Sequence, residues 1–134
     1  DRPDPASEAA FREKTRVVAL AFLSHPLLAG VRPARFSYRS QRSRWGSCSA
    51  KGTISLNYAC ARLPDPLLEY IIAHELCHLA RLDHSAVFHR LLSAVLPDAA
   101  KRKAELSRYR IAGPSLPVAS PVWNQGTSME VDLA

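Results

Sequence analysis

The sequence lacks long apolar runs and paired cysteines, and each absence excludes a class of protein. The longest apolar run, Val17–Leu23, has seven residues, whereas about 18 are needed to cross a bilayer. It has neither a cationic start nor a small-residue cleavage site after it, so we predict no signal peptide. The chain starts at Asp1 and its one methionine is Met129, so we expect either a processed product or a cloned fragment, with an N-terminal piece missing.

The three cysteines give an odd count without a C-x-x-C pair, which excludes a disulfide scaffold and a Cys-rich zinc knuckle. We expect reduced thiols, most of them in small buried apolar positions, and therefore a cytoplasmic protein. The cysteines are Cys48, Cys60 and Cys77.

What the sequence does contain is typical of one globular domain. It has 134 residues, 47% of them hydrophobic and 22% charged, with a formal charge of +6. This length suits a single domain, and the composition excludes wholesale disorder and a collagen-like repeat. We predict a domain over residues 7–112 and an extended Pro-rich tail over 113–134.

Apolar residues recur at helical spacing in several segments, with capping residues before them and prolines after them. The segment after Pro66 has the widest apolar surface, so we expect its helix to be central. The expected helices are Glu8–Leu23, Leu67–Leu82, Ala86–Leu96 and Ala99–Tyr109, with Ser7 and Ser85 as N-caps.

Two stretches alternate between apolar and polar residues and predict strands. Phe36 and Tyr38 alternate in the first stretch, and Ile54, Leu56 and Tyr58 alternate in the second. Between them, Gly46, Ser47, Ser49 and Gly52 resemble turn residues. We therefore expect a β-hairpin or a small antiparallel meander, and an α+β fold class.

The chemistry is concentrated in His74-Glu75-Leu76-Cys77-His78, an H-E-x-x-H pattern on a predicted helix. Four residues is close to one helical turn, so both imidazoles point the same way and suit one Zn²⁺ ion. Glu75 is one step round the helix, where its carboxylate can take a proton from a water that zinc has acidified. The pattern predicts a catalytic metal site.

A catalytic zinc site needs a third protein ligand and one open position. His84 follows His78 after five residues, at a break between helices, and is our first choice. His89 in the next helix is the competitor, and Glu105 could supply a carboxylate instead. His25, beside a proline, is expected to be structural.

At this point the sequence resembles the YgjP-like metallopeptidases, small relatives of SprT and Spartan-type proteases. The resemblance covers roughly residues 8–112. It implies a minigluzincin-like fold, a small antiparallel sheet above the active-site helix, zinc on His74, His78 and His84, and Glu75 as general base. The motifs that carry it are Gln41-Arg42-Ser43-Arg44-Trp45-Gly46-Ser47-Cys48-Ser49, Gly52-Thr53-Ile54-Ser55-Leu56-Asn57, and H-E-L-C-H followed by His84-Ser85 and Phe88.

Three features depart from the usual family pattern. Asp83 stands where members usually carry Asn, and His89 where they carry Trp. The strands that usually precede the first helix are absent from this chain.

By the same resemblance, the Ile54–Tyr58 strand is the expected substrate strand, with Asn57 as a substrate-binding residue. Metallopeptidases can hold a peptide as a strand added to a sheet edge. Alternatively, Asn57 only closes a turn or strand end. We expect Trp45 in the core rather than as a substrate platform.

A basic segment interleaved with aromatic residues suggests a second partner. Arginines for phosphates and aromatics for base stacking would suit single-stranded DNA or another nucleic acid, with Arg39, Arg42 and Arg44 as contacts. A solvated basic face is the alternative. The five arginines are Arg32, Arg35, Arg39, Arg42 and Arg44, beside Phe36, Tyr38 and Trp45.

The leading hypothesis is a zinc-dependent metalloendopeptidase acting on a protein or peptide. One alternative is a zinc-dependent endoribonuclease with the same H-x3-H-x5-H spacing, although that family typically has Gly at the position of Glu75. A non-catalytic nucleic-acid-binding zinc module is the other alternative. Structural sites usually fill the fourth position, and Cys77 should face away from His78.

Overall fold

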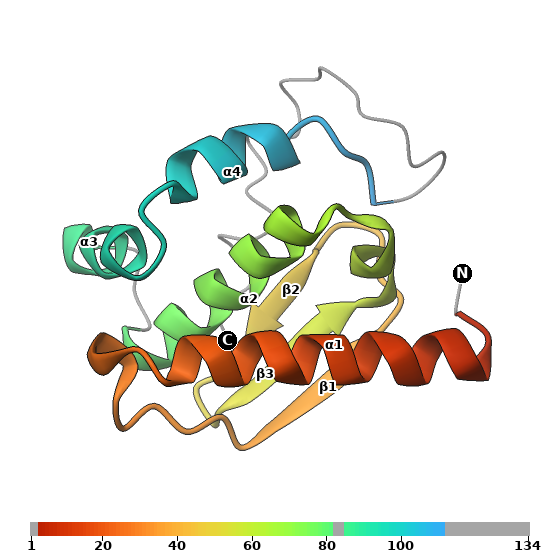
Figure 1. The fold of residues 1–134 in the computed structure, drawn as a ribbon, viewed down its shortest axis with the longest axis horizontal. Coiled ribbons are helices and arrows are strands. Elements are labelled where there is room, and N and C mark those ends of the chain that lie inside the picture. Colours follow the sequence, from red (N-terminus) through yellow and green to blue (C-terminus); the bar gives the residue numbers. More distant parts are fainter. Residues whose placement is uncertain (1–2, 82–84, 112–134) are drawn as a thin grey trace.

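A computed structural model describes residues 3–81 and 85–111 of the chain. The predicted tail, residues 113–134, and the predicted third ligand, His84, lie outside the described residues. Helices and a small sheet pack together as an α+β fold, which confirms the expected class (Figure 1). The elements are α1 (Pro5–Leu23), η1 (Pro26–Leu28), β1 (Arg35–Arg39), β2 (Gly46–Cys48), β3 (Thr53–Asn57), η2 (Tyr58–Arg62), α2 (Asp65–Ala80), α3 (Ala86–Val95) and α4 (Ala99–Leu106).

Helix α1 begins earlier than predicted, because Asp4 rather than Ser7 is its N-cap. The Asp4 carboxylate accepts a hydrogen bond of 2.9 Å from the backbone N–H of Ser7. Pro5 occupies the first turn, where the missing N–H costs nothing. The predicted cap at Ser85 is confirmed, since its hydroxyl accepts from the backbone N–H of Phe88.

The sheet is mixed rather than antiparallel, which corrects the expected hairpin or meander. The strand order is β1-β3-β2, with β1 parallel and β2 antiparallel to β3. Residues 40–45 carry the chain from one side of β3 to the other, so the first two strands flank the third. Gly46 and Ser47, predicted as turn residues, lie in β2. Strand propensity is low for Gly, so packing decides their conformation.

Helix α2 lies at the centre, as its apolar surface predicts. Figure 1 shows it between α1 and the sheet on one side and α3 and α4 on the other. Ile71, Ile72 and Leu76 have no exposed surface, and burial of each such side chain stabilises the fold by about 1.5–3 kcal/mol. Of the helices that the structure describes, none is both long and apolar enough to span a membrane.

Buried residues next to the sheet hold the loop before β2. Asn57 is 4% exposed; its side-chain amide donates to the carbonyls of Gln41 (2.9 Å) and Arg44 (2.7 Å). Its side-chain oxygen accepts from the backbone N–H of Ala59. Trp45 lies in the core, as expected. The three cysteines are also free and buried, which confirms that interpretation.

Replacement of Asn57 by Ala is expected to lower the free energy of unfolding by about 2–3 kcal/mol, because it removes a buried side chain whose hydrogen bonds hold the partly buried carbonyls of Gln41 and Arg44. Denaturant unfolding measures this change. Ser43→Ala, an exposed change in the same loop, should stay within about 0.5 kcal/mol of the parent. Equal effects of the two substitutions would contradict the assigned role of Asn57.

Candidate metal centre

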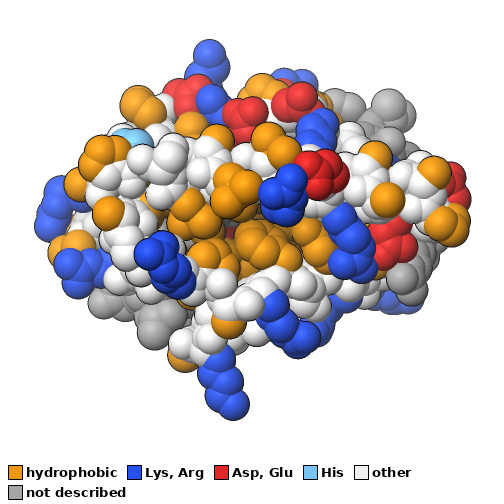
Figure 2. Space-filling view, turned by 60° about the horizontal axis from the view of Figure 1, so that its bottom comes forward, with side chains coloured by type: hydrophobic (Ala, Val, Ile, Leu, Met, Phe, Trp, Pro, Cys, Tyr) orange, Lys and Arg blue, Asp and Glu red, His pale blue; other side chains and the backbone are white. Residues whose placement is uncertain are grey.

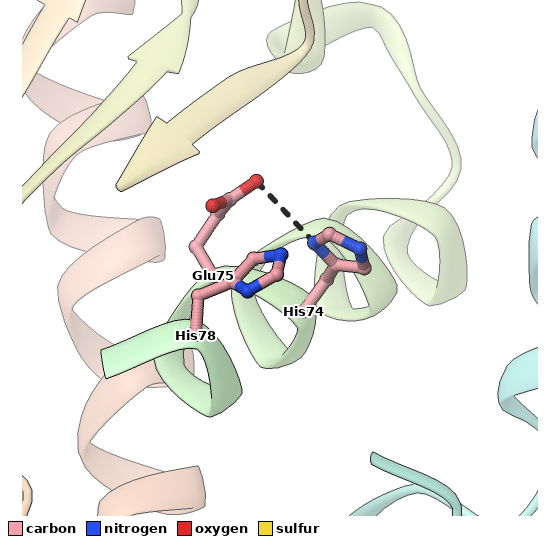
Figure 3. Close-up of side chains that lie close together, drawn as sticks. All are labelled: His74, Glu75 and His78. Carbon is pink, nitrogen blue, oxygen red and sulfur yellow. Dashed lines mark ion pairs between the residues drawn. The ribbon is translucent and has the colours of Figure 1, made fainter. Parts of the chain in front are cut away.

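One turn of α2 brings three polar side chains into the core of the protein. His74, Glu75 and His78 are buried, and one ligand atom from each lies within 4.8 Å of the others (Figure 3). The two imidazole rings have centroids 4.6 Å apart. The pattern of two histidines four residues apart therefore forms the cluster that the sequence predicts.

A backbone contact at the end of α2 favours one tautomer of His78. Its Nδ1 lies 3.4 Å from the backbone carbonyl of Arg81. A carbonyl only accepts hydrogen bonds, so this contact favours the tautomer with the proton on Nδ1. That tautomer leaves Nε2 as the atom that can bind a metal, which is a common arrangement for histidine ligands.

The carboxylate of Glu75 lies between its own helix and strand β2. One oxygen is 3.5 Å from Nδ1 of His74. A side chain at Gly46 would place its Cβ 3.4 Å from the same Glu75 oxygen and 3.2 Å from the backbone oxygen of Ser55. Gly46 thus lets β2 pack closely against both the carboxylate of Glu75 and the backbone of β3. Because the glycine and serine residues around Gly46 resemble a turn, the sequence did not predict this role of Gly46. The family motif around Trp45 was the sequence feature that pointed to it.

Phe88, from the first turn of α3, contacts both imidazoles. Its ring is stacked on His78, with centroids 4.3 Å apart and planes 9° from parallel. The same ring meets His74 edge-on at 5.2 Å. Phe88 is fully buried, so it limits the orientations open to both rings. Phe88 belongs to the family motif in the sequence, but its role was not predictable from the motif, because the contact joins two helices.

The other candidate ligands either do not belong to this cluster or lie outside the described residues. The cluster among the described residues consists of His74, Glu75 and His78. His84 lies outside the described residues. His89 and Glu105 are exposed on α3 and α4. His25 accepts a hydrogen bond from Leu27 at the start of η1, which confirms a structural role.

Cys77 does not join the cluster, as its helical position predicts. Burial raises the pKa of its thiol to about 12. The thiol is therefore neutral at physiological pH, whereas a metal ligand is a thiolate. Burial also raises the pKa of the Cys60 thiol, and the negative charge of Glu75 adds to that rise.

The donors present fit a zinc ion. Two imidazoles on one helical turn are borderline-soft nitrogen ligands, which suit Zn²⁺ better than Mg²⁺ or Ca²⁺. The carbonyl behind His78 supplies the outer hydrogen bond that metal-bound histidines usually make. Two protein ligands leave a catalytic site incomplete, so the chemistry of the cluster requires a third.

The predicted substrate and nucleic-acid residues lie around the sheet. Asn57 ends β3, which has a neighbouring strand on each side, so β3 has no open edge to which a peptide could add. Substrate binding by Asn57 itself stays a prediction. Arg39 is exposed at the end of β1, and Arg42 and Arg44 lie in the loop before β2. Their predicted binding of nucleic acid is likewise untested.

Comparison with known proteins places these features in a family. A sequence profile described as YgjP-like, metallopeptidase domain matches residues 12–109. A search of curated proteins finds no match.

Two solved structures are similar to this one. The metallopeptidase zymogen of Pyrococcus abyssi abylysin has a TM-score of 0.59 and 28% identity, over 66% of this chain and 88% of that chain. The metallopeptidase zymogen of Methanocaldococcus jannaschii jannalysin has a TM-score of 0.55 and 21% identity, over 66% and 89%. Because the sequence identity to jannalysin is only 21%, that similarity supports the fold alone. Together they confirm the expected minigluzincin-like architecture.

Replacement of Gly46 by Ala is expected to lower the free energy of unfolding by about 1–3 kcal/mol, because the new methyl group crowds Glu75 and the backbone of β3. Chemical denaturation gives the value. The neighbouring change Ser47→Ala, in the same strand, serves as the control. If the two variants are equally stable, Gly46 does not provide the space assigned to it.

Replacement of Phe88 by Leu is expected to weaken zinc binding about tenfold, because the two imidazoles lose the ring that restrains them. Competition with a chromophoric chelator measures the affinity without any need for catalysis. The control is Leu92→Ala, which removes another buried side chain of α3, one helical turn from Phe88. It should destabilise the fold but bind zinc more tightly than Phe88→Leu does. The reverse order of zinc affinities would contradict this role.

Proposed function

The chain belongs to the YgjP-like metallopeptidase family, and on that premise we propose that it is a zinc-dependent endopeptidase with Glu75 as its general base. The buried cluster of His74, Glu75 and His78 on one helical turn is the observation that carries the proposal. In it, nitrogen donors and a carboxylate are close enough to serve one reaction.

We assign the metal to His74 and His78, with His84 as the third ligand on its sequence position four residues beyond α2. A bound zinc ion would supply a Lewis acid that polarises the peptide carbonyl and increases the acidity of water. Glu75 would accept the proton of the attacking water and deliver it to the leaving amine. Gly46 lets β2 pack close to that carboxylate, and Phe88 keeps the imidazoles aligned.

We further propose that the substrate adds to β2 rather than to β3. In the described part of the chain, β2 is an edge strand, and its first residue, Gly46, lies against Glu75. An extended peptide bound to this edge through main-chain hydrogen bonds would pass next to the general base. Asn57 would then act indirectly, because its hydrogen bonds hold the loop that leads into β2.

The structure and the family match give little support to the two alternative functions predicted from the sequence, an endoribonuclease and a non-catalytic zinc module. The family match is to metallopeptidases, and Glu75 has a place in the cluster that an endoribonuclease with Gly at this position would not use. A non-catalytic zinc module usually has four protein ligands, whereas the described cluster offers two histidines and a carboxylate. Nucleic acid bound by Arg39, Arg42 and Arg44 stays a prediction about a partner, compatible with a peptidase.

Zinc-loaded protein is expected to cleave casein, and Glu75→Gln is expected to lower the rate by a factor of about 10² or more while zinc remains bound. Gel analysis of casein, with metal content measured on the same samples, tests this. Chelation should abolish cleavage and added zinc should restore it. Addition of single-stranded DNA as a second arm would show whether nucleic acid is required. Equal cleavage by the Glu75→Gln variant would refute the proposed base.

A further inference from the structure

The charges of this protein are separated along the sequence. From Lys14 to Pro64 there is no Asp or Glu, while nine residues are Lys or Arg. The remaining residues carry nine cations against twelve anions, so this segment has a charge of +9, the rest of the chain −3, and the whole chain +6. It contains all three strands. The sheet therefore belongs to a region that attracts anionic groups.

Within this region, β1 offers an edge for strand pairing. It pairs with β3 on one side, and it is an edge strand of the described sheet. Along such a strand, alternate residues direct their N–H and C=O groups away from the neighbouring strand, and these groups can pair with another chain. Arg35 and Arg39 are exposed at the two ends of β1. An added strand would meet a cation at each end.

A hollow with apolar walls lies on the same face of the molecule. Figure 2, which turns the lower side of Figure 1 towards the reader, shows apolar side chains at the bottom of this hollow, several Lys and Arg side chains around it, and Asp and Glu side chains on part of its rim. Helix α1 and strand β1 both run along this side (Figure 1). Their partly exposed apolar residues include Val18, Phe22, Phe36 and Tyr38.

A cavity of about 490 Å³ lies at the end of the sheet where β1 and β3 begin. Like the edge of β1, it carries basic side chains. It is lined by residues before β1, by the turn between β2 and β3 and by the end of α2, and its charged side chains are those of Arg32 and Lys51. Gly52 in that turn accepts a backbone hydrogen bond from Ala34, the residue before β1. The basic lining therefore continues from β1 into this cavity.

Two aromatic residues of this region, Trp45 and Tyr38, are already used in packing, which argues against base stacking of single-stranded nucleic acid on them. Base stacking requires exposed aromatic faces. Trp45 is 1% exposed. The ring of Tyr38 is covered by the guanidinium of Arg12, 4.4 Å from its centroid, and its hydroxyl is hydrogen-bonded to Thr15. A strand edge beside apolar side chains suits a polypeptide better.

We propose that the outer edge of β1, with the hollow beside α1, is a docking site for an extended acidic segment of another polypeptide. The segment adds to the sheet next to β1, places apolar side chains in the hollow and pairs its carboxylates with Arg35 and Arg39. This site lies at the opposite edge of the sheet from β2, and the proposal does not depend on the peptidase activity.

Fluorescence anisotropy with a short labelled peptide of alternating Glu and Val tests the proposal. The Glu75→Gln variant is used throughout, so that the peptide stays intact and a failure to bind is distinct from a failure to cleave. Arg35→Glu/Arg39→Glu should weaken binding at least about tenfold. A peptide with N-methyl groups at alternate residues keeps its charges but loses main-chain donors, and it should bind at least about tenfold more weakly than the unmethylated peptide.

Lys101→Glu/Arg108→Glu makes the same change of charge near α4, and should change the affinity much less than the β1 variant. Equal effects of the two double variants would overturn the proposal in favour of a general charge effect. If the methylated peptide binds as tightly as the unmethylated peptide, strand addition is excluded. Oligodeoxythymidylate that binds as tightly as the peptide and displaces it would assign the surface to nucleic acid instead. The methylated peptide keeps the proposal testable if the β1 variant does not fold.

Discussion

The burial of α2 is the constraint on which the rest of the structure depends. A helix whose middle residues, 70–78, are all buried stabilises the fold through its apolar side chains, but this one also carries two histidines and a glutamate into the core. Burial of polar groups without partners costs several kcal/mol each. The surrounding elements must therefore provide contacts for His74, Glu75 and His78. The structure provides the backbone carbonyl of Arg81 beside His78, the carboxylate of Glu75 beside His74, and the ring of Phe88 against both imidazoles.

The surroundings of this cluster come from elements far apart in the sequence. Gly46 lies in β2, and its position depends on Asn57, which holds the loop before that strand. Phe88 is placed by α3, whose first turn is capped by Ser85. The metal centre is consequently a product of the whole fold. A polar cluster held in this way keeps its geometry before any substrate arrives, which is what a catalytic site requires.

The strand order gives the sheet two different edges. Because β3 is central, β1 and β2 are each open on their outer side in the described part of the chain. The β2 edge lies beside Glu75, whereas the β1 edge lies beside α1 in the basic region. Extended chains could therefore occupy both edges at once. On the proposals above, one edge presents a substrate to the metal centre and the other holds an acidic partner.

The sequence by itself determined the four helices to within a few residues, the core position of Trp45 and the pairing of His74 with His78. Helical periodicity is local, so residues four apart share a face in any context. The tertiary structure decided the rest. It placed β3 between β1 and β2, made a strand of Gly46–Cys48 and stacked Phe88 on His78. Each of these depends on segments brought together from distant parts of the chain, and strand pairing and side-chain packing of that kind leave no periodic signal in the sequence.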